Sequence, residues 1–124
     1  KTVSLEEFVE YSKSMFAYWT EDDFASSFRK MLTIEQFWSE EMQGLYQQYL
    51  SSGPAAYVKD LFESMGIAHA EENAVRFYAT MYFYYSVYDG ADDKEKVKNE
   101  FASAIGSMAQ EWIKQPKLTQ IRKS

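Results

Sequence analysis

The sequence predicts an all-α protein, a bundle of about six helices. Apolar residues recur at the i, i+3, i+4 spacing of a helix, and no segment alternates with the period of two typical of a strand. Helix start signals precede several of these apolar stripes. Only two prolines and five glycines occur, and they punctuate the periodic segments. At 124 residues we expect a single domain, 1–124, long enough to bury a core.

The first two predicted helices begin with capping patterns. Residues 4–7 read Ser-Leu-Glu-Glu, a capping box, and apolar residues over 5–19 follow helical spacing. Thr20 is predicted to cap the second helix, and the acids at 21–23 favour the positive end of its dipole. This helix is expected to end near 37–38.

The third and fourth helices are separated by Ser-Gly-Pro at 52–54. Ser39 is predicted to cap the third helix. Pro54 is expected at the first position of the fourth, where its missing N–H costs nothing. Gly66 is the expected left-handed stop.

The fifth helix is predicted from about Ala70 to Tyr88. Asp92 or Asp93 caps a sixth, which is expected to run to 115 and stop at Pro116.

These last two helices carry more apolar surface than one small subunit readily covers. Over 74–88 the only charge is Arg76, and a helix that is apolar nearly all round must be covered nearly all round. The sixth helix has a second stripe of small residues, where Gly106 would let another backbone approach. Either both helices are central in one core, or they form a four-helix interface with a twofold-related copy. The predicted homodimer interface comprises Tyr78, Tyr82, Tyr85, Phe101, Ala102, Ile105, Ala109, Trp112 and Ile113.

Composition excludes several functions. The net charge of −6 argues against a nucleic-acid-binding surface, which needs clustered basic residues. No apolar run is long enough to cross a membrane, no signal peptide is recognisable, and cysteine is absent, so we expect a cytoplasmic protein. Catalytic and metal-binding motifs are missing, and the single histidine, His69, falls in a predicted loop. We therefore expect no enzyme, no metal and no cofactor.

Ligand binding has more support, because 18% of the residues are aromatic. Small-molecule pockets are mostly apolar and aromatic, with a few orienting polar groups. Glu35 falls on an apolar stripe, so it faces either a ligand or water at a helix end. Arg76 either meets an anionic ligand or pairs with Glu72 one helical turn away. The predicted ligand-binding residues are Met15, Phe16, Trp19, Phe28, Met31, Glu35, Trp38, Tyr46, Phe62, Phe77 and Met81.

Five segments together resemble the regulatory half of TetR-family transcriptional repressors, in order along nearly the whole chain. They are Met31-Leu-Thr-Ile-Glu-Gln-Phe37, Leu45-Tyr-Gln-Gln-Tyr49, Gly53-Pro54, Leu61-Phe62 and the aromatic run from Phe77 to Gly90.

The resemblance implies a cavity for a small-molecule effector among the first helices and a dimer interface made by the last two. It also implies a helix-turn-helix domain ahead of Lys1, and no segment here reads as one, so operator DNA would be bound only through that missing domain. Ligand binding would then control DNA binding. The alternative is a helical protein-interaction or scaffold domain without a ligand.

Overall fold

The computed structural model describes residues 3–114, which form six α-helices and contain no strand, so the all-α prediction is confirmed for this part of the chain. The helices are α1 (Leu5–Glu21), α2 (Asp23–Glu35), α3 (Glu40–Leu50), α4 (Ser52–Ser64), α5 (Ala70–Gly90) and α6 (Lys94–Lys114). The predicted stop of the sixth helix at 115–116 lies outside the described residues.

Three predicted helix signals are present in the structure. The Ser4 hydroxyl accepts the Glu7 backbone N–H at 3.1 Å, and the Glu7 carboxylate accepts the Ser4 N–H at 2.9 Å, which completes the capping box. The Ser39 hydroxyl accepts the Met42 N–H at the start of α3. Gly66 follows α4 with φ 75°, a left-handed conformation that glycine adopts without steric cost.

Two predicted helix starts differ from the structure by two residues. Asp22, not Thr20, caps α2, because its carboxylate accepts the Ala25 N–H at 2.9 Å. Thr20 instead lies inside α1 and donates to the Phe16 carbonyl. Pro54 is the third residue of α4 rather than the first, and it remains within the first turn, where backbone N–H groups have no partner inside the helix.

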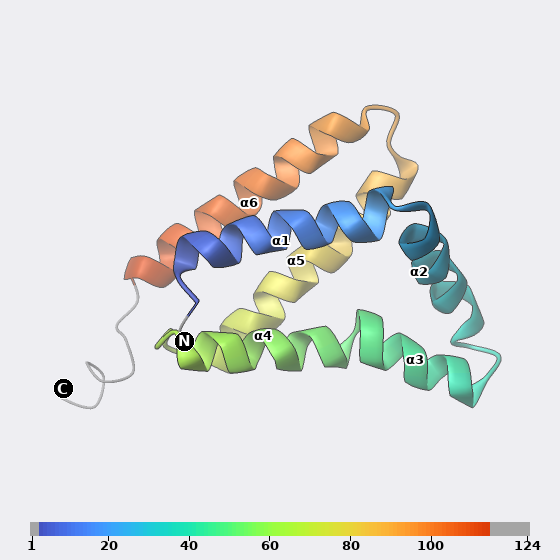
Figure 1. The fold of residues 1–124 in the computed structure, drawn as a ribbon, viewed down its shortest axis with the longest axis horizontal. Coiled ribbons are helices and arrows are strands. Elements are labelled where there is room, and N and C mark those ends of the chain that lie inside the picture. Colours follow the sequence, from blue (N-terminus) through green and yellow to red (C-terminus); the bar gives the residue numbers. More distant parts are fainter. Residues whose placement is uncertain (1–2, 115–124) are drawn as a thin grey trace.

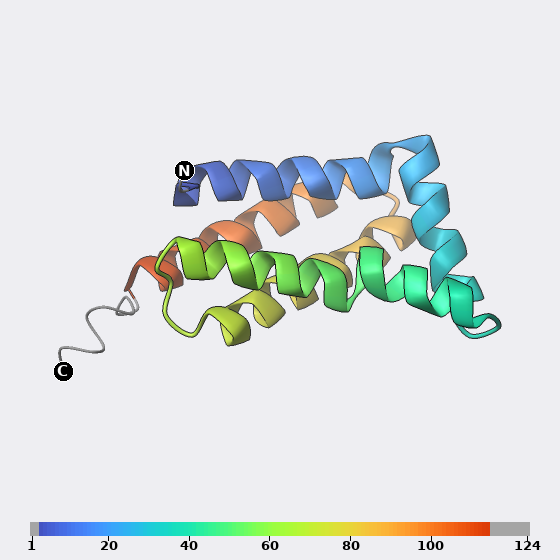
Figure 2. The same cartoon turned by 60° about the horizontal axis from the view of Figure 1, so that its bottom comes forward.

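α1, α2 and the pair α3–α4 form three sides of an open frame, and α5 packs against the two long sides, α1 and α4 (Figures 1 and 2). α3 and α4 lie almost in line, and α2 connects the end of α1 to the start of this rod (Figure 2). α5 packs against α4, α6 and α1, while α6 also packs against α1. α1 and the α3–α4 rod face one another, and α5 contacts both α1 and α4.

Aromatic rings dominate the core between α1, α4, α5 and α6. The Phe8 ring lies 5.1 Å from Phe62 and 5.0 Å from Phe77, and Trp112 of α6 lies 4.7 Å from Phe62. Phe16 stacks on Phe101 at 4.3 Å. A smaller cluster of Leu32, Tyr46 and Leu50 joins α2 to α3.

This packing corrects part of the predicted dimer interface. Six of its residues are buried inside the single chain because α1 and α4 cover the faces of α5 and α6 that carry them. They are Tyr78, Tyr85, Phe101, Ile105, Ala109 and Trp112. These six are therefore core residues of the single chain, and the dimer itself stays a prediction.

Candidate functional site

A cavity of about 230 Å³ lies between α1, the α3–α4 rod and α5. Its wall is largely aromatic, since eight of the fifteen lining residues carry aromatic rings. The lining residues are Phe8, Tyr11, Ser12, Met15, Trp19, Gln48, Tyr49, Gly53, Pro54, Tyr57, Val58, Phe77, Tyr78, Met81 and Tyr85. None of the fifteen is charged, so an uncharged ligand suits this wall.

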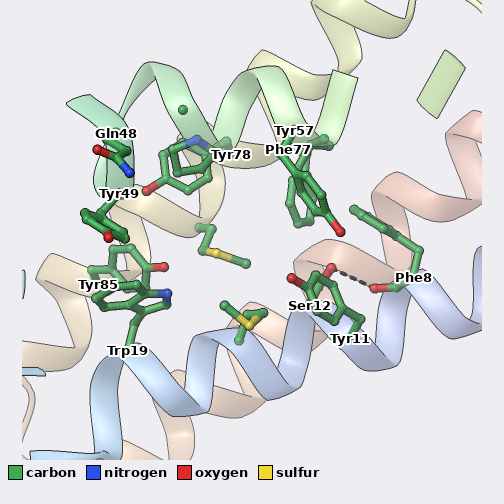
Figure 3. Close-up of a pocket in the computed structure, with 15 residues that line it drawn as sticks. Phe8, Tyr11, Ser12, Trp19, Gln48, Tyr49, Tyr57, Phe77, Tyr78 and Tyr85 are labelled. Atoms are coloured by element: carbon green, nitrogen blue, oxygen red, sulfur yellow. Dashed lines mark hydrogen bonds between the residues drawn. The ribbon is translucent and has the colours of Figure 1, made fainter. Parts of the chain in front are cut away.

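The cavity has two aromatic ends (Figure 3). Trp19, Tyr49 and Tyr85 gather at one end, where the last turns of α1, α3 and α5 approach. Tyr11 and Tyr57 meet at the other, where burial and, to a smaller extent, the interaction with Tyr57 raise the pKa of the Tyr11 hydroxyl. Aromatic rings at both ends favour a planar ligand that can stack or meet ring edges.

Two buried hydroxyl groups on the wall have their protons engaged by backbone carbonyls. Ser12, 1% exposed, donates to the Phe8 carbonyl at 2.8 Å. Tyr78 donates to the Leu50 carbonyl at 2.6 Å, which ties α5 to the last residue of α3. Burial raises the pKa of both Tyr78 and Tyr85, so these phenols are neutral at physiological pH.

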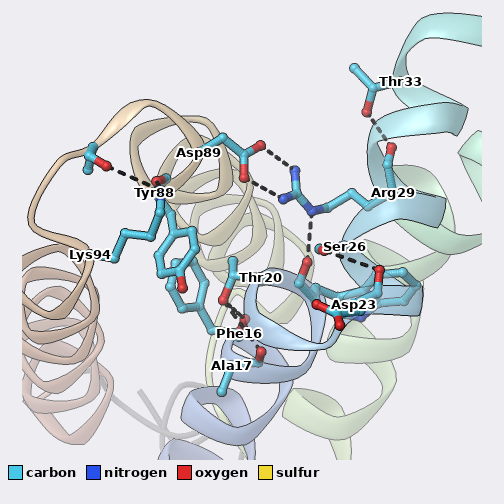
Figure 4. A network of polar contacts seen from close by, with 12 residues as sticks. Phe16, Ala17, Thr20, Asp23, Ser26, Arg29, Thr33, Tyr88, Asp89 and Lys94 are labelled. Carbon is cyan, nitrogen blue, oxygen red and sulfur yellow. Dashed lines mark hydrogen bonds and ion pairs between the residues drawn. The ribbon is translucent and has the colours of Figure 1, made fainter.

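Behind the Trp19–Tyr85 end lies an arginine that joins three helices (Figure 4). The buried Arg29 guanidinium forms two hydrogen bonds to the Asp89 carboxylate, at 3.0 and 2.7 Å. Its Nε–H donates to the Trp19 carbonyl at 3.0 Å, and its centre lies 4.9 Å from the Tyr85 ring centroid. Arg29 therefore holds α2 against the ends of α1 and α5, and contacts two residues of the cavity wall.

The structure brings together four of the predicted ligand-binding residues: Met15, Trp19, Phe77 and Met81 all line the cavity. The other seven lie outside it. Phe16 and Phe62 pack against other rings in the core, and Tyr46 is buried in the cluster between α2 and α3.

The remaining four misplaced residues belong to α2 and the turn after it. Phe28 packs on Phe24 and on the outer edge of Tyr49, at ring distances of 5.9 and 5.7 Å. Met31, Glu35 and Trp38 are exposed, and Trp38 is 80% exposed. The stripe predicted to face a ligand points away from the cavity because α2 buries its adjacent face, through Ala25, Arg29 and Leu32.

Both charged ligand candidates are accounted for on the surface. Glu35 is exposed at the last residue of α2, and Arg76 donates to Glu72 at 2.8 Å, the predicted i, i+4 pair. His69 lies exposed between α4 and α5 with φ 53°.

Three residues of the predicted dimer interface remain accessible. Tyr82 and Ile113 are exposed, and Ala102 is half-buried. Apart from the backbone of α6 itself, no atom of residues 3–114 would lie within 4 Å of a side-chain carbon placed at Gly106.

Sequence reasoning missed most of the polar wall: Tyr11, Ser12, Gln48, Tyr49 and Tyr57. Tyr49 and Tyr57 belong to the apolar stripes predicted for the third and fourth helices, whereas Tyr11, Ser12 and Gln48 lie beside such stripes. The three tyrosines share one signal, an amphipathic side chain at or beside an apolar stripe, which suits a half-open wall.

No family model, curated protein or solved structure matches this chain. Among residues 3–114, no cluster of three or more His, Cys, Asp or Glu side chains is arranged to hold a metal ion. Within the same range, no helix combines the length and apolar character needed to cross a bilayer.

Proposed function

We propose that this chain is an effector-sensing domain whose cavity binds a small, uncharged, largely aromatic molecule. The observation that carries the proposal is an aromatic cavity without a charged wall residue. Its size suits such a ligand, because an apolar cavity of roughly 150 Å³ accommodates benzene. At about 230 Å³, this cavity has room for two fused rings.

The arrangement also suits sensing rather than storage alone. A ligand between α1 and the α3–α4 rod contacts both sides of the frame, so its binding free energy depends on their separation. Such a ligand shifts the population between open and closed frames, provided that it binds the two unequally. Arg29 would pass a movement at the Trp19–Tyr85 end to α2.

The sequence resemblance to TetR-family repressors supports a wider form of this proposal. In that form the domain acts as a homodimer, and the effector controls operator binding by a helix-turn-helix domain in a longer protein. The exposed Tyr82, Phe83 and Val75 of α5 would contribute to the dimer contact.

A fluorescence titration with 2-methoxynaphthalene, an uncharged two-ring probe, tests the binding proposal. We expect saturable one-to-one binding that Met15→Trp abolishes, because the indole fills the cavity. The matched control is Met31→Trp, on the exposed face of α2, which should leave the affinity unchanged. Absence of saturable binding, or equal binding by both variants, would contradict the proposal.

The exposed aromatic residues around α2 favour a second candidate, a protein-docking domain. Phe24, Ile34, Phe37 and Trp38 are each more than 60% exposed. Surfaces of this kind mark interaction sites more often than isolated exposed residues do. If docking is the function, Phe37→Ser and Trp38→Ser should abolish co-purification of a partner while leaving probe binding intact.

A further inference from the structure

We infer that the cavity selects uncharged aromatic molecules that carry a hydrogen-bond donor, such as a phenolic hydroxyl or a heteroaromatic N–H. This inference rests on the proposed function and adds the chemical class of its ligand. It depends on two wall hydroxyls whose hydrogen-bond directions are fixed by the backbone.

A hydroxyl group has one proton to donate and two lone pairs to accept. The Ser12 proton is directed to the Phe8 carbonyl and the Tyr78 proton to the Leu50 carbonyl, and carbonyls can only accept. These two oxygens therefore have only lone pairs to offer, and the Tyr78 oxygen also interacts with the neighbouring Tyr85 hydroxyl. They lie on α1 and α5, two of the helices that enclose the ligand.

A ligand donor meets these lone pairs favourably, whereas a ligand acceptor meets like partial charge. Rotating the Ser12 hydroxyl leaves the Phe8 carbonyl its α1 bond from the Ser12 backbone N–H. Rotating the Tyr78 hydroxyl toward a ligand acceptor, however, leaves the carbonyl of Leu50, the last residue of α3, without its side-chain donor. That exchange costs as much as it gains, because a buried unpaired polar group loses its solvation without compensation. The Tyr78 bond is the more secure, since its acceptor is the carbonyl of the last residue of α3.

A cationic ligand is disfavoured for a separate reason. Rings attract cations, and Trp19, Tyr49 and Tyr85 could stack on one. However, none of the fifteen lining residues is a carboxylate, and an unpaired charge removed from water is costly. The Arg29 guanidinium already lies over one face of the Tyr85 ring, so that face is not open to a ligand cation.

Three probes on one ring system test the inference at neutral pH: 2-naphthol, 2-methoxynaphthalene and 2-naphthyltrimethylammonium. We expect the naphthol to bind about three- to tenfold more tightly than the ether, the value of one net hydrogen bond. The cationic probe should bind most weakly. Ser12→Ala and Tyr78→Phe should each reduce the ratio of naphthol affinity to ether affinity, and this ratio, measured within each variant, is the readout.

Thr20→Val is the matched control for Ser12→Ala. Thr20 is also buried on α1 and donates to the carbonyl one turn earlier, at 2.7 Å, but it does not line the cavity. This control should keep the full naphthol preference.

The outcomes separate the inference from the function on which it rests. Equal or tighter binding of the ether, tightest binding of the cation, or a preference unchanged in both hydroxyl variants would overturn the inference while the ligand-binding function stood. Failure of all three probes to bind would overturn the function itself.

Discussion

Asp89→Asn should destabilise the fold far more than the loss of an ordinary surface ion pair. The Arg29 side chain is only 6% exposed, so water cannot solvate its guanidinium in place of the Asp89 carboxylate. Asparagine fits the same space but lacks the charge, and its amide can present N–H toward the guanidinium. The buried cation would then keep the Trp19 carbonyl and the Tyr85 ring as partners.

The magnitude follows from burial. Removing one partner of a fully buried ion pair costs about 3–5 kcal/mol. The Asp89 side chain is 29% exposed, so water already solvates part of this pair and the cost is reduced. We expect Asp89→Asn to lower the free energy of unfolding by about 2 kcal/mol, in the range of hydrogen bonds to charged groups. Urea denaturation followed by far-UV circular dichroism measures it.

Two controls isolate the cause. Glu72→Gln breaks the surface pair with Arg76, in which the Glu72 side chain is 61% exposed and the Arg76 side chain 68%. This variant should lower the free energy of unfolding by less than about 0.5 kcal/mol. In an Arg29→Met background, Asp89→Asn should cost almost nothing, because no unpaired cation remains. Equal losses for Asp89→Asn and Glu72→Gln, or an undiminished loss in the Arg29→Met background, would refute the reasoning.

Two further predictions concern the core and the alkaline limb of stability. Phe62→Ala removes a fully buried ring and should lower the free energy of unfolding by about 3–5 kcal/mol. Phe24→Ala removes a ring that is 74% exposed and should change it by less than about 0.5 kcal/mol in the same urea assay. Similar losses in the two variants would contradict the packing described. Burial raises the pKa of Tyr46 to about 12 and raises those of Tyr78 and Tyr85, so the folded state holds protons that the unfolded state releases near its ordinary pKa of about 10. Stability should therefore be independent of these groups below pH about 10 and fall as pH rises from there through the folded pKa values, and tyrosinate absorbance should show these phenols ionising only on unfolding. Ionisation of all ten tyrosines before unfolding would contradict this assignment.

Local signals in the sequence predicted helix boundaries well. The capping box at Ser4 and the left-handed stop at Gly66 act through bonds within a few residues, so spacing alone reveals them. The Thr20 error has a local cause too, since Asp22 offers an equally good cap two residues later.

Which face of each helix meets the cavity could not be predicted in the same way. A helical wheel shows that a stripe is apolar, but not whether α1, α4 or solvent lies against it. Phe16 and Met15 are neighbours in sequence, yet one fills the core and the other lines the cavity. Arg29 and Asp89 are sixty positions apart, and the residues next to either one do not indicate that the two side chains pair.

The apolar surface of α5 was interpreted as either part of one core or part of a dimer interface, and the dimer stays a prediction. Within the chain, α1, α4 and α6 cover Phe77, Met81 and Tyr85, and the cavity adjoins the same face. What stays uncovered on α5 is the narrower set of Val75, Tyr82 and Phe83.

Methionine methyl NMR tests the central claim, ligand binding in this cavity, most directly. Of the six methionines, Met15 and Met81 line the cavity, and the other four do not. Titration with 2-methoxynaphthalene should shift the Met15 and Met81 methyl resonances saturably, through the ring current of the probe, and leave the other four nearly unmoved. A titration in which the Met15 and Met81 methyls stay still, whether or not other methyls shift, would contradict the account.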